Sequence, residues 1–273
     1  MKKSNSLIIL TISIIIFFIM IYPVYKTTVA QTKESKEIKV EKENGKMIKY
    51  ISGKDTVSAY LSVPDGNGPF PALIVIHEWW GLNDWIKKSA DEFADSGFIA
   101  LAIDLYHGNS ASSPGEARKL SGSVPKERAA TDLRSAFDYL RNMKNVEAKN
   151  IGSIGWCFGG GYSLMAALQL NDLSACIINY GSLIMDTSAL KKINCPVLGI
   201  FGEKDQNITP AKVNEFENAL NEAGVKNKIT IYPAAEHAFM NPDNPDRYNE
   251  SAAQKAWKET FTFLNNNLKR GNK

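Results

Sequence analysis

One short stretch near the middle of the chain, residues 151–162, restricts the possible folds more than any other. It reads IGSIGWCFGGGY. Apolar residues typical of a strand, up to Ile154, lead into a glycine-rich turn at residues 155–159, and a helix-like apolar pattern follows from Tyr162. The glycines on either side of Cys157 indicate flanking positions that have no room for a Cβ. The stretch therefore predicts a cysteine at a tight strand-to-helix turn.

This turn resembles the nucleophile elbow G-x-S-x-G, with cysteine in the serine position. In such a turn the first N–H groups of the helix point at the nucleophile, where negative charge develops during acyl transfer. The alternative is a glycine-rich turn around Cys157 as a packed, inert side chain. The pattern alone leaves both interpretations open.

Length and composition favour one large α/β domain, because the chain has 273 residues and 44% of them are hydrophobic. The net charge is only +3 and the basic residues are scattered, so we expect no nucleic-acid partner. Three cysteines are an odd number without metal-type spacing, so neither a disulfide framework nor a metal site is predicted. No cofactor motif is present, and we expect no cofactor.

The amino terminus, residues 1–30, differs from the rest of the chain. Lys2 and Lys3 precede an apolar run at residues 7–24, and the small-x-small sequence of residues 28–30 follows. This pattern predicts a cleaved secretory signal peptide or an uncleaved membrane anchor, and the two are left open. In either case the remainder is exported, and is then secreted or periplasmic or tethered through residues 7–24 to the outer face of the cytoplasmic membrane. Residues 31–46 are predicted to be a polar linker, and residues 47–273 the folded domain.

Strand-like and helix-like segments alternate through the domain. Strands are predicted within residues 47–63 (an antiparallel pair) and at 72–77, 98–105, 151–156, 174–180, 196–201 and 229–232. Helices are predicted at residues 85–96, 125–143, 209–224 and 251–268 and directly after the central turn, whereas residues 109–124 are predicted to be a loop. This order predicts an α/β fold with a mostly parallel sheet and helices on both faces.

Three side chains with complementary chemistry follow predicted strands in the chain order nucleophile, acid, histidine: Cys157, Asp205 and His237. The carboxyl ends of parallel strands meet at one edge, so these groups are expected to come together. Cys157 would attack a carbonyl carbon, His237 would carry the proton, and Asp205 would hold the histidine tautomer. Backbone N–H groups of Phe158 and Trp79 would bind the oxyanion.

Each of these side chains also has an unremarkable interpretation: a packed cysteine, a turn aspartate and a structural histidine. Their joint occurrence at strand ends, in this order, favours the catalytic interpretation. Asp104 precedes the nucleophile and is predicted to be structural, Cys176 and Cys195 are predicted to be buried, and His107 is at most a substrate contact.

Five motifs together resemble the dienelactone hydrolase family: residues 77–81 (HEWWG), 104–106 (DLY), 155–160 (GWCFGG), 202–205 (GEKD) and 236–239 (EHAF). The resemblance covers about residues 46–268. It implies an α/β-hydrolase fold with a Cys-His-Asp triad that hydrolyses small lactones or esters. It also implies that Glu78 pairs with the resting thiol and helps to form the thiolate.

The sequence departs from the family in its charged pocket residues. Dienelactone hydrolases bind the substrate carboxylate with two arginines, one just after the DLY motif and one shortly after the His-x-Phe motif, and neither stretch has an arginine here. We therefore expect an aromatic, less charged pocket formed by Trp80, Tyr106 and Phe239, although Arg118 or Arg247 is able to reach it from a loop.

The leading hypothesis is hydrolysis of a small ester or lactone through an acyl-thioester intermediate. A broader carboxylesterase or thioesterase on the same triad is the alternative enzyme. A non-catalytic binding protein that keeps the fold is the alternative of a different class.

Overall fold

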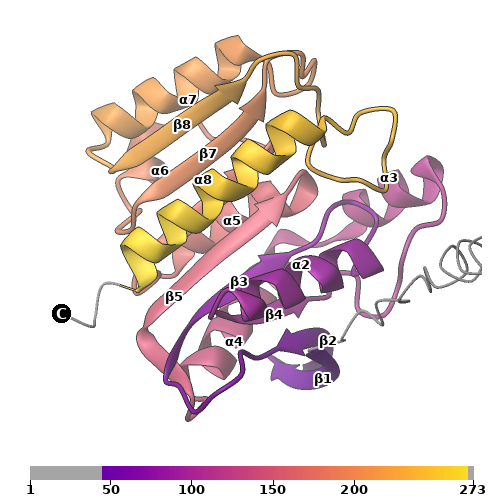
Figure 1. Ribbon diagram of the computed structural model, residues 1–273, viewed down its shortest axis with the longest axis vertical. Helices are drawn as coiled ribbons and strands as arrows, with labels where there is room; N and C mark the ends of the chain where they lie inside the picture. The colour runs from indigo at the N-terminus through magenta and orange to yellow at the C-terminus, as the bar shows by residue number, and fades with distance from the viewer. Residues whose placement is uncertain (1–44, 270–273) are drawn as a thin grey trace, which may run out of the picture. The chain divides into compact units, whose positions relative to one another are not determined.

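A computed structural model describes residues 45–269 of the chain, and these residues build one eight-stranded sheet flanked by helices (Figure 1). The strand order is β1-β2-β4-β3-β5-β6-β7-β8. β1 pairs with β2, and β2 with β4, in antiparallel fashion, whereas all pairs from β4 to β8 are parallel. The predicted α/β fold class is confirmed.

The strands are β1 (Gly45–Ser52), β2 (Asp55–Ser62), β3 (Phe70–Ile76), β4 (Ile99–Ile103), β5 (Val146–Trp156), β6 (Ala175–Asn179), β7 (Val197–Gly202) and β8 (Asn227–Tyr232). The helices are α2 (Asp84–Asp95), α3 (Pro114–Ser123), α4 (Lys126–Arg141), α5 (Phe158–Gln169), α6 (Thr187–Leu190), α7 (Pro210–Glu222) and α8 (Glu250–Leu268).

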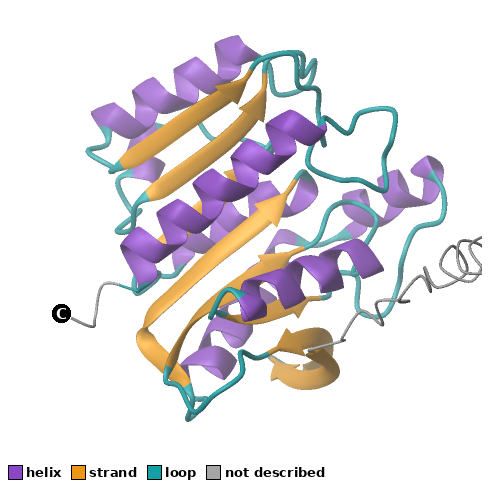
Figure 2. Ribbon diagram, viewed as in Figure 1, coloured by secondary structure: helices purple, strands orange, loops and turns teal. Residues whose placement is uncertain are grey.

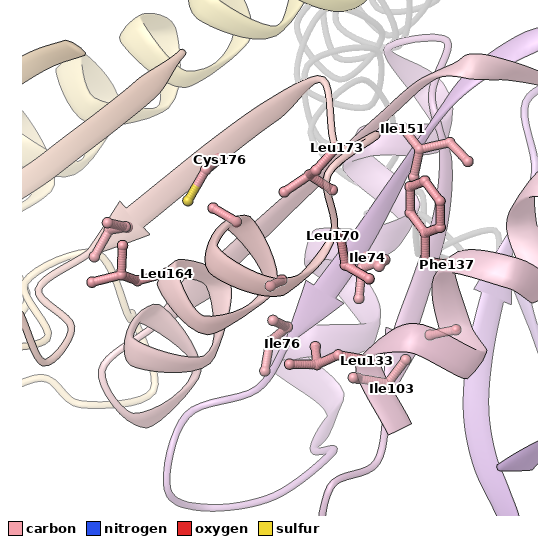
Figure 3. Close-up of a cluster of buried hydrophobic side chains, with 14 of the residues drawn as sticks. Ile74, Ile76, Ile103, Leu133, Phe137, Ile151, Leu164, Leu170, Leu173 and Cys176 are labelled. Carbon is pink, nitrogen blue, oxygen red and sulfur yellow. The ribbon is translucent and has the colours of Figure 1, made fainter. Parts of the chain in front are cut away.

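Helices cover both faces of the sheet because its inner strands are apolar on both sides, as the continuous hydrophobic runs predicted. Alternate residues of β3 belong to different cores: Leu73 and Val75 pack in the core under α2 and α8, and Ile74 and Ile76 in the core under α4, α5 and α7. Figure 2 shows α2 and α8 lying across the nearer face of the sheet. Figure 3 shows the opposite core, where Leu133 and Leu164 from α4 and α5 meet side chains of β3 and β6.

The strand order reverses at β3, and this reversal positions the site. β4 follows β3 in sequence and lies on one side of it, whereas β5 lies on the other side. The loops after β3 and β5 therefore diverge at the carboxyl edge of the sheet, and in open α/β folds ligands bind in the crevice outside such a reversal point.

Two predicted boundaries are corrected. Residues 109–124 contain helix α3, which Ser113 caps by accepting from the Glu116 N–H and which has Pro114 in its first turn. Strand β1 begins at Gly45, inside the predicted linker, because the Gly45 N–H donates to the Tyr60 hydroxyl and the residue pairs with Ser62.

The predictions for residues 1–30, and for the linker up to residue 44, lie outside the described residues. Among residues 45–269, none of the helices is both long enough and apolar enough to span a bilayer.

Candidate active site

Cys157 lies at the turn between the central strand β5 and helix α5, as the sequence predicts. It is the N-cap residue of α5 and has φ 54° and ψ −114°, a conformation that L-residues rarely adopt. Its N–H donates to the Asn179 carbonyl of the neighbouring strand (2.9 Å), which holds the turn in place. The side chain is partly exposed, so Cys157 is presented to solvent rather than packed as an inert cysteine.

The flanking glycines are required by close backbone approach. A Cβ on Gly155 would collide with the Gly159 carbonyl, and a Cβ on Gly159 would collide with the Ile76 carbonyl of β3. A Cβ on Gly160 would lie 2.8 Å from the Gly181 Cα, which is also too close. These contacts bring the start of α5 between the ends of β3 and β6 and fix where the cysteine stands.

Asp205 and His237 follow β7 and β8, and backbone hydrogen bonds join their two loops. Glu203 N donates to the Tyr232 carbonyl (3.0 Å), and Lys204 N donates to the Ala235 carbonyl (2.8 Å). These bonds extend the pairing of β7 and β8 beyond the sheet and hold the acid and the histidine at a constant spacing.

Cys157, His237 and Asp205 form a continuous hydrogen-bonded chain. His237 Nε2 lies 3.0 Å from Cys157 Sγ, and His237 Nδ1 donates to Asp205 Oδ2 at 2.6 Å. Asp205 Oδ1 accepts from the Asn207 and Ile208 N–H groups at 2.8 and 3.0 Å, so both carboxylate oxygens are occupied. This arrangement places a proton acceptor next to the thiol and orients it through a carboxylate.

The electrostatics favour a charged histidine. Burial alone would lower the pKa of His237, but the hydrogen bonds to Asp205 and Cys157 and their negative charges raise this pKa to about 10. Burial opposes ionisation of Asp205, yet the His237 contact and the backbone N–H donors lower the pKa of Asp205 below its ordinary value. These interactions favour an imidazolium between the Asp205 carboxylate and the Cys157 sulfur.

The two backbone N–H groups predicted to bind an oxyanion, those of Phe158 and Trp79, lie at the ends of neighbouring strands β5 and β3. Phe158 is the first residue of α5, and the first N–H groups of a helix have no acceptor within their own helix. Trp79 lies in the loop after β3, and its N–H belongs to the same peptide as the Glu78 carbonyl, which accepts from His77 Nδ1 at 2.6 Å. The two N–H groups therefore belong to the two loops that diverge at the crevice.

Glu78 is almost completely buried, with 2% of its surface exposed. Its Oε2 accepts from Asn241 Nδ2 at 2.7 Å, whereas the Cys157 sulfur is next to His237, so the implied pairing of Glu78 with the thiol is not the arrangement in this structure. Burial raises the pKa of Glu78 to about 7, against the opposing effects of the Asn241 hydrogen bond and the His237 charge.

The predicted pocket residues fall into two groups. Trp80 is half-buried and lines a hollow of about 550 Å³ together with Asn241, and the Tyr106 ring packs against Phe158 next to Cys157. Phe239 is wrong as a pocket residue. It is completely buried and packs on Tyr180 in the core under α2 and α8.

The other two cysteines have no part in the hydrogen-bonded chain of Cys157, His237 and Asp205. Cys176 and Cys195 are buried, and burial raises both of their pKa values, that of Cys176 to about 11.

Asp104 accepts from the Tyr106 N–H at 2.9 Å, a structural role, and His107 pairs with the buried Asp132 at 2.9 Å. His77 donates through Nδ1 to the Glu78 carbonyl (2.6 Å), while its Nε2 accepts from the Leu105 N–H (3.2 Å), so both ring nitrogens are occupied.

A second hollow, of about 760 Å³, opens beside Asp205 and His237. Arg247 lines it, and Arg118 is exposed on α3. The charges that surround Arg247 are mixed, because Lys204, Glu203 and Glu236 line the same hollow.

Sequence reasoning missed two residues beside the site, Asn241 and Tyr180. Asn241 lies in the stretch after the His-x-Phe motif that lacks an arginine, and its side chain contacts Glu78. Tyr180 directly follows β6 with φ 39°, and its ring packs edge-on against His237 at 5.3 Å between ring centroids. In the sequence, the position of Tyr180 at the end of a predicted strand, directly before Gly181, was the one feature that could have pointed to this residue.

The sheet order, the strand-to-helix turn and the chain order of the site residues define an α/β-hydrolase fold. The sequence model that defines the dienelactone hydrolase family matches residues 57–268, so the chain belongs to this family.

Several known proteins are similar to this chain over most of its length. Protein usf of Aquifex pyrophilus is 32% identical over 227 residues, which cover 81% of this chain and 97% of that protein. A "Putative carboxymethylenebutenolidase" of Aquifex aeolicus is 28% identical, with 82% of this chain and all of that protein covered. The crystal structure of a "Putative Dienelactone Hydrolase" from Klebsiella pneumoniae superposes with a TM-score of 0.74 at 26% identity, covering 81% of this chain and 97% of that one.

Proposed function

We propose that this hydrolase cleaves small, uncharged esters or lactones with Cys157 as the nucleophile. The observation that carries the proposal is the hydrogen-bonded chain Cys157–His237–Asp205, with 3.0 Å from sulfur to imidazole and 2.6 Å from imidazole to carboxylate. Family membership supports a hydrolase acting on small molecules.

In the first half-reaction the Cys157 sulfur attacks the carbonyl carbon, and the π electrons of the carbonyl move onto its oxygen. The N–H groups of Phe158 and Trp79 bind this oxyanion. When the carbonyl re-forms, the C–O bond to the leaving group breaks and His237 donates its proton to the departing oxygen. The products are an alcohol and an acyl-thioester; a lactone gives one molecule that stays attached through its acyl end.

In the second half-reaction His237, now neutral, takes a proton from water. The resulting hydroxide attacks the thioester, and the C–S bond breaks to release the acid and restore the thiolate beside the imidazolium. A thiolate is a better leaving group than an amide nitrogen, so the enzyme should hydrolyse esters far faster than the matching amides.

The substrate class follows from the groups around Cys157. Trp79 and Trp80 are partly exposed and provide aromatic surface on the side of the β3 loop, whereas the Tyr106 ring is buried against Phe158. The two positions where the family carries arginines are occupied by other residues. Arg247 lies in a hollow of mixed charge beside His237. This lining suits a neutral acyl group better than a carboxylate.

The test is steady-state turnover of a panel of neutral esters, neutral lactones, thioesters and the anionic dienelactone. We expect neutral esters and lactones to be preferred, and turnover to vanish in Cys157→Ala but not in Cys195→Ala. A preference for thioesters would favour the broader acyl hydrolase, and binding without turnover would favour the non-catalytic alternative. A preference for the anionic dienelactone would contradict an uncharged substrate.

We further propose that the enzyme acts outside the cytoplasm, on the basis of the basic and apolar pattern of residues 2–24. Fractionation of cells that express the full chain tests the location. Protein that remains in the cytoplasm at its full mass would contradict it, and a mass reduced by about the first 30 residues would indicate cleavage.

A further inference from the structure

One side-chain hydrogen bond joins two loops of the candidate active site across 163 positions of sequence. Asn241 Nδ2 donates to Glu78 Oε2 at 2.7 Å, and both residues are only 2% exposed. The orientation of the amide is fixed independently, because Asn241 Oδ1 accepts from the Asp243 N–H at 2.9 Å. With its oxygen committed to that donor, the amide must direct its NH₂ group at Glu78.

The two ends of this hydrogen bond lie next to different parts of the proposed machinery. Asn241 N donates to the Ala238 carbonyl at 3.1 Å, so Asn241 closes the turn that begins directly after His237. Glu78 directly precedes Trp79, the proposed oxyanion donor. The bond therefore connects the histidine loop after β8 to the loop after β3, although β5, β6 and β7 separate these strands in the sheet.

Charges of both signs lie near the Glu78 carboxyl, and its hydrogen-bond donor, the Asn241 amide, is neutral. The His237 charge attracts the carboxylate and Asp243 repels it, while the buried Tyr180 hydroxyl and the neutral Asn241 amide are its polar neighbours. An amide donor holds a buried carboxyl in either protonation state, because it adds no charge of its own.

We propose that Asn241 is a positioning residue for the proposed hydrolysis: through its hydrogen bond to Glu78 it holds the His237 loop in place against the loop that carries the Trp79 N–H. The inference rests on the proposed function. Asn241 reaches the reacting atoms only through Glu78, so its loss should change the chemical step more than substrate binding.

Variants of the full chain test this proposal, with Asn244 of the same loop as the matched control. Asn241→Ala should lower kcat by about ten- to a hundredfold with KM changed less than about threefold, because a small misplacement of catalytic groups is costly. Asn244→Ala should stay within about twofold of the parent. Equal kcat values for the two alanine variants would overturn the proposal.

Asn241→Asp gives a readout that a merely structural role would not produce. At about pH 5.5 two neighbouring buried carboxyls share one proton and keep a hydrogen bond, whereas at about pH 8.5 both would have to ionise and would repel. The ratio of the kcat of Asn241→Asp to that of Asn244→Asp should therefore fall at least tenfold over this range. A ratio that is the same at both pH values would overturn the proposal.

If Asn241→Asp is too unstable for kinetics, the melting temperature replaces the rate. Its deficit relative to Asn244→Asp should widen as the pH rises, and a constant deficit would overturn the inference. Failure of the proposed function is recognised separately: the parent would show no turnover, or Cys157→Ala would turn over as fast as the parent.

Discussion

The Sγ atom of Cys157 lies 3.0 Å from Nε2 of His237, although the two residues are 80 positions apart. They follow strands β5 and β8, which β6 and β7 separate in the sheet. The loop that carries His237 is held to the loop after β7 by the hydrogen bond from Lys204 N to the Ala235 carbonyl. A proton can therefore pass directly from sulfur to imidazole.

This contact predicts that Cys157 alone reacts with iodoacetamide in the native protein. Its side chain is partly exposed beside a histidine, whereas Cys176 and Cys195 are buried and their thiol pKa values are raised. Mass spectrometry after brief labelling at about pH 7 should show one alkylated cysteine, and none in Cys157→Ala. Comparable labelling of Cys176 would contradict the burial that we describe.

Asp205→Asn should lower kcat by roughly 10²–10⁴-fold, because an amide at this position no longer stabilises the imidazolium and can favour the wrong tautomer. Steady-state kinetics on the best substrate of the panel provide the measurement. Asp186→Asn is the matched control, since Asp186 caps helix α6 at the surface and asparagine is an equally good cap. A loss below about tenfold would show that Asp205 does not orient His237 during the reaction.

Glu78→Gln should stabilise the protein at alkaline pH. Burial raises the pKa of Glu78 from 4.5 to about 7, so the stability linked to its protonated form is complete below pH 4.5 and is lost as the pH rises through about 7. Glutamine is neutral at every pH and its oxygen still accepts from Asn241.

We expect Glu78→Gln to raise the free energy of unfolding by roughly 2–3 kcal/mol at about pH 8, and to change it little near pH 4.5. Urea unfolding at the two pH values measures this difference. Glu215→Gln, on the exposed side of α7, should change neither value. A gain for Glu78→Gln that is independent of pH would mean that Glu78 does not titrate as described.

The catalytic candidates were predictable from sequence because each has a local signal and their chain order is informative. The glycines around Cys157 occupy positions where a Cβ would collide with neighbouring backbone atoms, and Asp205 and His237 each follow a recognisable strand. Since parallel strands end at one edge, strand ends in sequence translate directly into neighbours in space.

Phe239 and Asn241 were not predictable, because the direction of a loop side chain depends on the tertiary turn that carries it. Ala238 has φ 63°, and beyond this turn the Phe239 side chain lies in the core instead of the pocket. The partner of Asn241, Glu78, is 163 positions away, and no local sequence pattern predicts their contact.

Helix α3 was not predicted for a different reason. Apart from Ala117 its residues are exposed or half-buried, so its hydrophobic pattern is weak even though Ser113 and Pro114 are good start signals.

Gly159→Ala should destabilise the fold and disturb the site together. The added methyl group would collide with the carbonyl oxygens of Ile76 and His77, backbone atoms of β3 and its end that cannot rotate away. Helix α5 would have to move outward, at an expected cost of about 3 kcal/mol, and the Phe158 N–H would move away from the Trp79 loop.

Gly122→Ala is the matched control for this substitution. Gly122 lies in helix α3, where an added Cβ meets no atom within 4 Å, so alanine should stabilise the protein by about 0.5–1 kcal/mol through its better helix propensity. Urea unfolding of both variants separates the effect of the close contact from that of the glycine itself. If Gly159→Ala unfolded at the same urea concentration as the parent, α5 would not be packed against the end of β3, and the proposed geometry of the oxyanion donors would be wrong.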